Sequence, residues 1–340
     1  MTPAPSPSPG PGDQGVDLDA MRRALALAAS VRTRTPPNPW VGCVVVTGDR
    51  RFEGATQPPG GWHAEVVALT AAGDRARGAT LYTTLEPCAH QGLTPPCTGT
   101  IVASGVARVV VGLLDPDPRV SGRGVDELRR AGIEVTVGVA AEEGAELLAP
   151  YLKHRRTGRP WVVLKLAATL DGRIAAPDGT SRWLTGSEAR ADAHRLRATS
   201  DAVLVGAGTV RSDDPQLTVR TDPEPDRQPV RVVLGKAPAG ARVLPAMEMN
   251  GEPSAVLDEL GAQGILQVLV EGGATVAHAF HHGGVVDRYV VYLAPALFGG
   301  NDAVPMFAGA GANTMESLWR GRLVSVTRLG DDLRVELEAA

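Results

Sequence analysis

Short valine-rich runs alternate with helix-like segments along the whole 340-residue chain, and this alternation constrains the fold more than any other feature. In the first half, strands are expected at Val41–Val46, Ala79–Leu85, Ala107–Asp115 and Ile133–Val139. Helices are expected from Val16, near residues 63–72, after Pro96, near 125–131 and from Ala141. Apolar strands that alternate with helices predict a sheet covered on both faces.

The second half continues the alternation but shares no sequence motif with the first. Strands are expected at Trp161–Leu170, Ala202–Val210, Val230–Gly235, Gln267–Gly273 and Arg288–Pro295, with helices near Ser187–Ala198 and after Gly273. A C-terminal hairpin follows, in which Gly330-Asp331 marks the turn.

The length suits two domains of about 150 residues each. A basic, polar run from Tyr151 to Pro160 precedes a new apolar strand, and the boundary is placed there. We therefore expect a tail at 1–15, a first domain at 16–150, a linker at 151–158 and a second domain at 159–340. The tail is rich in proline, serine and glycine, a composition that predicts disorder.

Charge and cysteine content narrow the class of protein. The net charge of −4 argues against a nucleic-acid binder, because phosphate contact needs a clustered basic surface. Neither a signal peptide nor a run of about 20 apolar residues is found, so no membrane partner is expected. Three cysteines do not make a disulfide framework and favour a reducing compartment. These features predict a cytoplasmic protein that acts on small molecules.

Two stretches carry the ligand set of a catalytic zinc. "GGWHAEVVAL" contains His63 and Glu65, and "TLEPCAHQGLTPPC" contains Cys88 and Cys97. A catalytic zinc takes about three protein ligands and leaves the fourth position for water, a set that His63, Cys88 and Cys97 can supply. Glu65 can then move protons without touching the metal. The order matches the zinc base deaminases, although "AHQGLTPP" rather than two residues separates the cysteines.

Simpler interpretations exist for single residues of this set. A histidine and a glutamate two residues apart often occur by chance, and a structural zinc is the main alternative. Glu65 argues against a structural zinc, since such a site closes all four positions and needs no adjacent carboxylate. Cys43 lies inside an apolar strand and is expected in the core. Surface or packing roles are expected for the histidines without ligand-like spacing, namely His154, His194, His278, His281 and His282.

Longer motifs extend over both halves. The first half contains "PPNPWVGCVVV", "HAEVVAL", "TLEPCAHQGLTPPC" and "DPDPRVSGRG"; the second contains "LKLAATLDGRIA", "SRWLTG", "DDPQLTVR" and "VEGGATVAHAF". From about Val16 to Leu337, the chain resembles the bifunctional riboflavin biosynthesis proteins, in which a pyrimidine deaminase is fused to a reductase. The resemblance implies an α/β fold with an N-terminal cytidine-deaminase-like three-layer domain and a C-terminal dihydrofolate-reductase-like domain.

The resemblance also implies two sequential reactions. Zinc-dependent hydrolysis would deaminate 2,5-diamino-6-(5-phosphoribosylamino)pyrimidin-4(3H)-one, and NADPH would then reduce the ribosyl group to a ribityl chain. A homo-oligomer joined through the reductase half is expected. One alternative keeps the zinc deaminase but makes the second half a degenerate or repurposed domain. Another is an editor of nucleic-acid bases, which the acidic charge disfavours.

Site residues follow from the same resemblance. The zinc ligands would be His63, Cys88 and Cys97, with Glu65 as proton carrier. The residues implied for the deaminase substrate are Asn38, His90 and the Asp115–Asp117 loop. The residues implied for the nicotinamide cofactor are Ala167, Trp183, Thr209, Asp213, Gly272 and Gly273. Those implied for the reductase substrate are Ser181, Arg197, Leu217, Arg220 and Glu271, with Lys165 and Asp171 close to the path of the hydride.

The residues themselves support parts of this assignment. "VEGGAT" ends a strand in two glycines and opens a helix at Ala274, so backbone N–H groups can hold a phosphate. Arg197 and Arg220 suit a phosphorylated sugar, because guanidinium forks bind phosphate bidentately. Taken alone, either arginine would be an ordinary surface charge.

Two positions depart from the family pattern. Leu93 stands where the family usually has a basic residue, and the lost charge-assisted contact would weaken phosphate binding by about 1.5–3 kcal/mol unless His90 or another basic group compensates. Lys236 follows "RVVLG" in place of a small residue, and the segment beyond it is shorter than usual by roughly a strand. Lys236 would either pair with the 2′-phosphate of NADPH or be a surface lysine.

Overall fold

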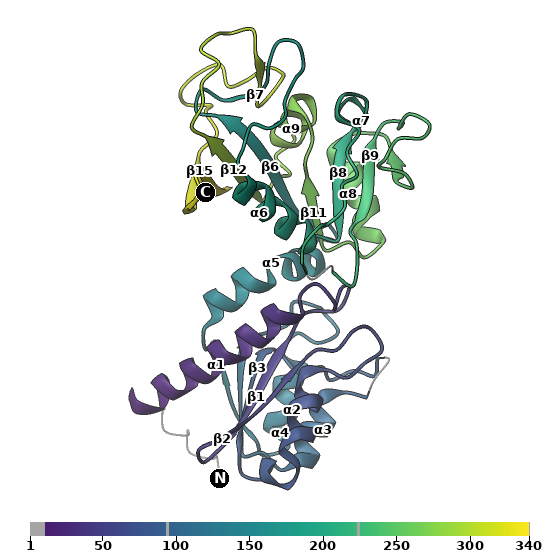
Figure 1. Cartoon of the computed structure of the whole chain (residues 1–340). Coiled ribbons are helices and arrows are strands. Elements are labelled where there is room, and N and C mark those ends of the chain that lie inside the picture. Colours follow the sequence, from purple (N-terminus) through teal and green to yellow (C-terminus); the bar gives the residue numbers. More distant parts are fainter. Residues whose placement is uncertain (1–10, 93–94, 223–224, 340) are drawn as a thin grey trace. The chain divides into compact units, whose positions relative to one another are not determined.

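The computed structural model describes residues 11–92, 95–222 and 225–339, and the chain divides into two compact units between Arg156 and Thr157 (Figure 1). Each unit is built on its own sheet. The division falls within the run 151–158 in which a linker is expected.

The first unit contains a five-stranded sheet in the order β2-β1-β3-β4-β5. Its strands are β1 (Gly42–Thr47), β2 (Arg50–Ala55), β3 (Thr80–Leu85), β4 (Arg108–Leu113) and β5 (Glu134–Val137). Strand β1 pairs antiparallel with β2 and β3, whereas β3, β4 and β5 are parallel. The carboxyl ends of β3 and β4 therefore lie at the same edge of the sheet.

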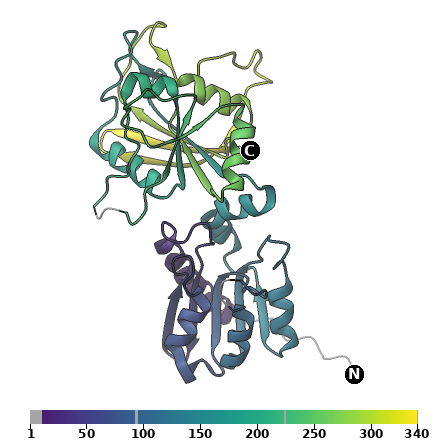
Figure 2. The same ribbon diagram turned by 90° about the vertical axis from the view of Figure 1, so that its right-hand side faces the viewer.

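Helices cover both faces of this sheet (Figures 1 and 2). One layer contains α1 (Pro11–Val31) and α5 (Ala141–Thr157); the other contains α2 (Ala64–Ala72), α3 (Cys97–Ser104) and α4 (Arg123–Arg130), with a 3-10 turn, η1 (Gly73–Ala76), after α2. Met21 and Leu25 of α1 pack on Val44 and Val110 of the sheet. Gly42 allows this close packing, because a Cβ there would lie 1.9 Å from the carbonyl oxygen of Ala24. The unit therefore has three layers.

The second unit contains an eight-stranded sheet in the order β10-β9-β8-β11-β6-β12-β15-β14. Its strands are β6 (Trp161–Thr169), β8 (Ala202–Gly206), β9 (Val230–Leu234), β10 (Met247–Met249), β11 (Gln267–Val270), β12 (Arg288–Ala294), β14 (Gly321–Leu329) and β15 (Asp332–Ala339). All neighbours from β10 to β12 are parallel, and the hairpin β14–β15 adds antiparallel to β12. A small second sheet pairs β7 (Arg173–Ala175) with β13 (Val304–Pro305).

Two separate cores lie on the two faces of the large sheet. Val162 and Leu164 of β6 pack on one face, toward α8 (Pro253–Ala262) and α9 (Ala274–His282). Val163, between them in the sequence, packs on the other face, toward α6 (Ser187–Ala198) and α7 (Ala207–Asp213). This burial on both faces explains why the parallel strands are mainly apolar.

Several element boundaries differ from the sequence-based expectation. Strand β8 ends at Gly206, and the expected strand residues up to Val210 form α7 instead. Ala207 and Val210 are buried three residues apart, a spacing that suits a helix. Strand β2 was missed because "RRFEGA" is polar and lies at the sheet edge. No strand was predicted in the segment beyond Lys236, which contains β10.

The expected linker is largely helical. Helix α5 continues through Pro150 to Thr157, because Leu148, Tyr151 and Leu152 continue its buried face. The basic residues that suggested a linker form the last turn of this helix, where positive charge interacts favourably with the helix dipole.

The expected disordered tail lies mostly outside the described residues. Its last part is helical, since α1 begins at Pro11, and a proline is tolerated in a first helical turn. Leu93 also lies outside the described residues. No helix in the described part of the chain is long and apolar enough to cross a membrane.

Candidate zinc centre and reductase site

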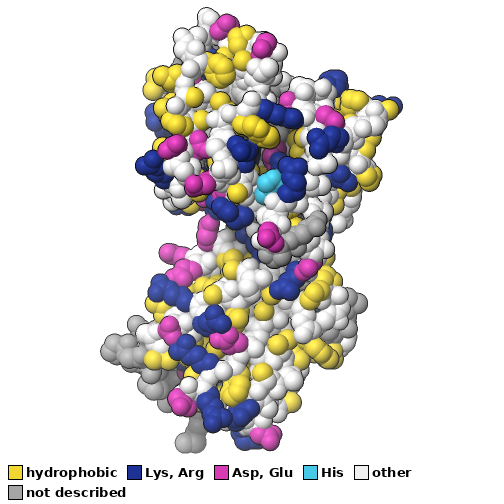
Figure 3. Space-filling model, viewed as in Figure 1, with side chains coloured by type: hydrophobic (Ala, Val, Ile, Leu, Met, Phe, Trp, Pro, Cys, Tyr) yellow, Lys and Arg dark blue, Asp and Glu magenta, His cyan; other side chains and the backbone are white. Residues whose placement is uncertain are grey.

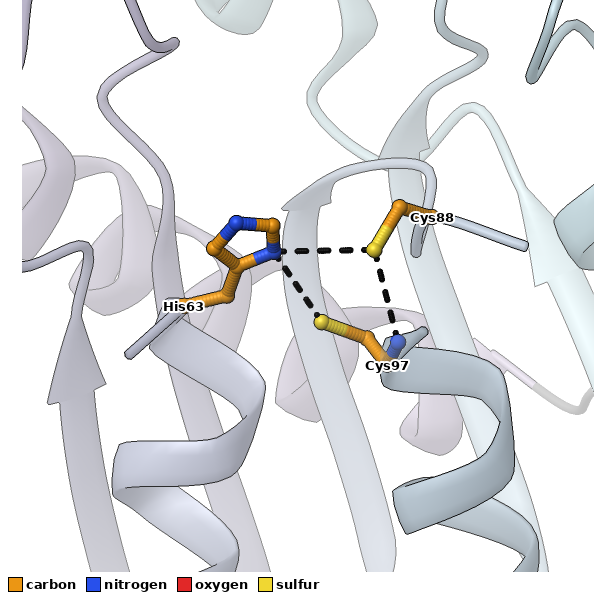
Figure 4. Close-up of side chains that lie close together, drawn as sticks. All are labelled: His63, Cys88 and Cys97. Atoms are coloured by element: carbon orange, nitrogen blue, oxygen red, sulfur yellow. Dashed lines mark hydrogen bonds between the residues drawn. The ribbon is translucent and has the colours of Figure 1, made fainter. Parts of the chain in front are cut away.

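Three side chains in the first unit converge in the arrangement of a metal site (Figure 4). His63 caps the N-terminus of α2, Cys88 follows β3, and Cys97 is the first residue of α3. Their ligand atoms lie within 4.8 Å of one another. His63 Nδ1 is 3.2 Å from Cys97 Sγ and 3.6 Å from Cys88 Sγ.

These separations fit a single tetrahedral ion. With a Zn–N distance of about 2.05 Å and a Zn–S distance of about 2.3 Å, tetrahedral geometry places nitrogen and sulfur about 3.6 Å apart. Two thiols and one imidazole are also the donor types that zinc prefers. The residues of this chain therefore fit zinc with three protein ligands, which is the number that catalytic sites use.

Local backbone bonds bring the two cysteines together despite the long segment between them. The backbone N–H of Cys97 donates to Cys88 Sγ at 3.3 Å, and that of Thr98 donates to the carbonyl oxygen of Cys88 at 3.3 Å. Contact with Cys97, and then with His63, lowers the pKa of the Cys88 thiol. A thiol must ionise to bind a metal ion, and this environment favours the thiolate.

Glu65 lies beside this cluster in the first turn of α2 and is 3% exposed. Burial raises its pKa to about 7, against the lowering effect of His63. A carboxyl group with such a pKa can both accept and donate a proton near neutral pH. Cys43 is fully buried on β1, as expected for a core residue, and burial raises the pKa of its thiol.

The other expected deaminase residues surround the carboxyl ends of β3 and β4. Asp115 is buried and accepts hydrogen bonds from Tyr151 Oη at 3.0 Å and from the backbone N–H of Asp117 at 2.9 Å. Asp117 is paired with Arg119, which lowers the pKa of Asp117 to about 2. His90 Nδ1 is buried and has no hydrogen-bond partner among the described residues. Asn38 lies in a turn, with its backbone N–H bonded to Thr35.

In the second unit, Glu271 is the centre of a buried ionic cluster at the end of β11. Arg197 of α6 bonds it through Nε to Oε1 at 2.5 Å and Nη2 to Oε2 at 2.9 Å. Lys165 Nζ of β6 lies 3.8 Å from Oε2. Burial alone would raise the pKa of Glu271, but Arg197 and Lys165 hold it below its ordinary value. Glu271 is therefore ionised and held in one orientation.

The two expected phosphate-binding arginines differ in availability. Arg197 is occupied by Glu271 and by the carbonyl oxygen of Thr218, to which Nη1 donates at 3.2 Å. Arg220 is exposed, and its backbone N–H donates to Nδ1 of His194 at 3.2 Å. Basic side chains lie beside a histidine on the face of this unit drawn in Figure 3. A surface or packing role was expected for His194, and its contact with Arg220 is of that kind.

The glycine turn before α9 fits a cofactor phosphate. Gly273 caps α9, and its backbone N–H donates to Thr209 Oγ1 at 3.1 Å. Because Gly273 has no side chain to cap the helix, the N–H groups of the first turn can bind an anion. A Cβ at Gly272 would lie 2.5 Å from Cβ of Val276, so this turn requires glycine.

The remaining expected residues lie at or near the carboxyl ends of the parallel strands and in the segments that follow them. Trp183 is 70% exposed beneath the guanidinium of Arg190, and the backbone carbonyl of Asp213 accepts a bond from Arg182. Ala167 lies near the end of β6, and Ser181 lies in the loop before α6. Lys236 is exposed next to β9.

Two expected residues are engaged within the protein. The side chain of Leu217 is buried in the core, so only its backbone can meet a substrate. Asp171 accepts bonds from Thr169 Oγ1 at 2.5 Å and from the backbone N–H of Gly299 at 2.9 Å, and it therefore holds the adjoining loop.

Together, a three-layer unit with a His/Cys/Cys centre and a parallel-sheet unit with a glycine turn at a helix N-terminus are typical of a zinc-dependent deaminase joined to a nicotinamide-dependent reductase. The family description "Cytidine and deoxycytidylate deaminase zinc-binding region" matches residues 15–113, and "RibD C-terminal domain" matches residues 160–335. The chain belongs to the RibD family of bifunctional riboflavin biosynthesis proteins.

Relatives that match nearly the whole chain support this assignment. Riboflavin biosynthesis protein RibD of Aquifex aeolicus is 42% identical, with 88% of this chain and 92% of the relative covered. The protein of the same name from Mycobacterium tuberculosis is 43% identical, with 90% of this chain and 92% of the relative covered. The solved structure of Acinetobacter baumannii RibD superposes with a TM-score of 0.90 at 40% identity and covers 96% of this chain and 100% of that one. The solved structure of a Thermotoga maritima deaminase/reductase superposes with a TM-score of 0.89 at 36% identity. The match covers 96% of this chain and 100% of that one.

These comparisons confirm several expectations. The family, the fold class, the two activities and the use of zinc and NADPH are as predicted. A degenerate second half is not favoured, because the similarity to bifunctional relatives extends over both halves. The protein is a zinc-dependent pyrimidine deaminase and an NADPH-dependent reductase of riboflavin biosynthesis.

Proposed function

We propose that the two units carry out the two reactions separately, residues 16–150 the deamination and residues 159–340 the reduction. The main support is the convergence of three ligand atoms within 4.8 Å beside the buried Glu65, all within the first unit. The ionic cluster around Glu271 and the glycine turn belong to the second unit.

In the deaminase, His63, Cys88 and Cys97 would hold zinc. When bound, zinc would lower the pKa of a water molecule, so that hydroxide is available to attack the ring carbon that carries the amine. Glu65 would carry both protons of this water, one to the ring nitrogen and the other to the leaving amine, so that ammonia departs and the water oxygen remains as a carbonyl group. Asn38 would bind the pyrimidine, and His90 with the Asp115–Asp117 loop would lie near the ribose and phosphate.

In the reductase, NADPH supplies the hydride that converts the ribosyl group into a ribityl chain. Gly272, Gly273 and the first turn of α9 would hold a cofactor phosphate, supported by Thr209. The other proposed cofactor contacts are Ala167, Trp183 and Asp213, with Lys236 as a candidate partner of the 2′-phosphate.

Substrate contacts in the reductase follow from which groups are available. The exposed Arg220 is placed to bind the substrate phosphate, together with Ser181 and the backbone at Leu217. Arg197 keeps Glu271 ionised and oriented toward the sugar. Lys165, beside Glu271, is the group placed to supply a proton as the hydride arrives, and Asp171 holds the neighbouring loop.

We further propose a cytoplasmic homo-oligomer that associates through the reductase unit. Strand β14 is at the edge of the large sheet, and Leu323 and Val326 on it are 57% and 54% exposed. An apolar edge strand of this kind favours pairing with another chain. Light scattering of wild type and Leu323→Lys tests this proposal, and a monomeric wild type contradicts it.

The decisive experiment follows the two reactions independently. Purified protein is incubated with the diamino substrate with and without NADPH, and ammonia and NADPH oxidation are measured. Ammonia is expected both with and without NADPH, and NADPH oxidation is expected only after deamination. Folded, zinc-loaded protein that releases no ammonia would overturn the deaminase assignment, and ammonia without NADPH oxidation would overturn that of the reductase.

A further inference from the structure

Glu86, two residues before the zinc ligand Cys88, carries a buried carboxylate that no expected role accounts for. It is 4% exposed. Its Oε2 accepts from the backbone N–H of Asp115 at 3.2 Å and of Gly122 at 2.9 Å. Its Oε1 accepts from the N–H of Gly124 at 2.9 Å and of Val125 at 3.2 Å. One side chain therefore binds four backbone groups of a segment that begins 29 residues later.

These bonds replace a local helix cap. Helix α4 begins after Gly122, a residue without a side chain that could accept from the first-turn N–H groups. Such groups are usually capped by a nearby Ser, Thr, Asp or Asn. Here the carboxylate of Glu86 does so from the end of β3, and its negative charge suits the N-terminal end of the helix dipole. The start of α4 is therefore fixed to the segment that carries Cys88.

Gly124 shows how close the two segments are. A Cβ at this position would lie 2.1 Å from the carbonyl oxygen of Pro87 and 3.3 Å from Cγ of Glu86. The first turn of α4 thus packs directly on the residue before Cys88, and only glycine permits it.

The same segment is held from its other end. The backbone N–H of Asp115 binds Glu86, and the carboxylate of Asp115 accepts a hydrogen bond from the hydroxyl of Tyr151 on α5. The run from Asp115 to Val125 is therefore anchored before substrate arrives, and it need not be ordered when substrate binds.

We infer that Glu86 is a positioning residue of the deaminase reaction. It fixes the Asp115–Val125 segment beside the zinc ligand Cys88, so that the ribose and phosphate of the substrate meet a preformed surface. The inference rests on the proposed placement of these groups at Asp115–Asp117. Glu86 itself touches neither zinc nor substrate.

Glu86→Gln tests this role, because an amide offers one acceptor oxygen and turns its NH2 toward two N–H donors. The KM of the diamino substrate should rise about 10- to 100-fold, the loss expected for charged hydrogen bonds. The kcat, the zinc content and the reductase activity on deaminated substrate should stay near wild type. Asp126→Asn is the matched control, since it removes an exposed carboxylate from the same first turn, and it should leave KM unchanged.

Gly124→Ala displaces the same turn by a steric route and should raise KM in the same way. If wild type releases no ammonia, the proposed function itself fails. If wild type is active and either folded variant keeps the wild-type KM, the inference is overturned. Loss of zinc with normal KM in the loaded fraction also overturns it, because that result shows a purely structural role.

Hydrogen exchange on wild-type protein decides the case in which neither variant folds. The amides of Asp115, Gly122, Gly124 and Val125 should be protected, and substrate should add little further protection. Rapid exchange at these amides before substrate is added would overturn the inference.

Discussion

Replacing Arg197 with alanine should destabilise the second unit, and the size of the effect can be estimated from the burial and hydrogen bonds of Arg197. The side chains of Arg197 and Glu271 are 15% and 8% exposed, and two hydrogen bonds join them. Removal of one partner from a buried pair costs about 3–5 kcal/mol, because the remaining charge stays buried. Lys165, 3.8 Å from Glu271, offsets part of this cost, so about 3 kcal/mol is expected. For a unit of this size, the transition temperature should fall by about 6–12 °C.

The loss of stability in Arg197→Ala should depend on pH, in a direction that follows from the pKa of Glu271. In wild type, Arg197 and Lys165 hold the pKa of Glu271 below the ordinary value of 4.5, despite its burial. A lowered folded-state pKa gives stability that is present above the unfolded pKa and is lost as pH falls through the folded pKa. In Arg197→Ala the carboxylate loses its main partner, so the deficit should be largest near neutral pH and shrink below about pH 4.5.

Calorimetry is the appropriate assay, because two units need not unfold in one transition and the first unit serves as an internal reference. Arg195→Ala is the matched control: Arg195 is on the same helix, and its side chain is 61% exposed where it contacts Asp192. It should cost less than about 1 kcal/mol. The Arg197→Ala/Glu271→Ala double variant should lose less stability than the sum of the single variants. Strict additivity, or equal effects of Arg197→Ala and Arg195→Ala, would refute the reasoning.

Three further outcomes are expected. Glu65→Gln should lower ammonia release by about 100-fold or more while zinc and reductase activity are retained, and full deamination by this variant would contradict the proton-carrier role. Removal of zinc by a chelator should abolish ammonia release but leave NADPH oxidation with deaminated substrate; loss of both would show that the units are not independent. Gly272→Ala should raise the KM of NADPH about 10-fold or more, because its Cβ would lie 2.5 Å from Cβ of Val276 and displace the turn. Gly311→Ala, where a Cβ meets nothing within 4 Å, is its control, and equal KM values in the two variants would count against the glycine turn as a cofactor site.

The zinc centre could be predicted from sequence because its parts are local. His63 and Glu65 lie at one helix start, and Cys88 and Cys97 belong to one segment closed by its own backbone bonds. The role of Glu86 could not be predicted in this way, since its partners begin 29 residues later and are backbone groups without a side-chain pattern.

The fold was predictable where burial left a pattern. The largely buried strands β3, β4 and β11 were found from their sequence, whereas the half-exposed edge strands β2 and β10 were not. Helix α5 showed the converse error. Its basic last turn has the composition of a linker, and only the buried Tyr151 and Leu152 reveal that the helix continues.

The position of β6 in the large sheet has a consequence for synthesis on the ribosome. Its neighbours are β11 and β12, so Val162 pairs with Val268, and Val163 with Arg288, more than a hundred residues later in the chain. The first sheet, by contrast, has all its strands once Val137 has been translated. The deaminase unit can therefore fold while the nascent chain still carries β6 with both edges unpaired. A chain that ends between β9 and β11 would keep β6 without either neighbour, so the reductase cannot be shortened from its C-terminal side to half a sheet.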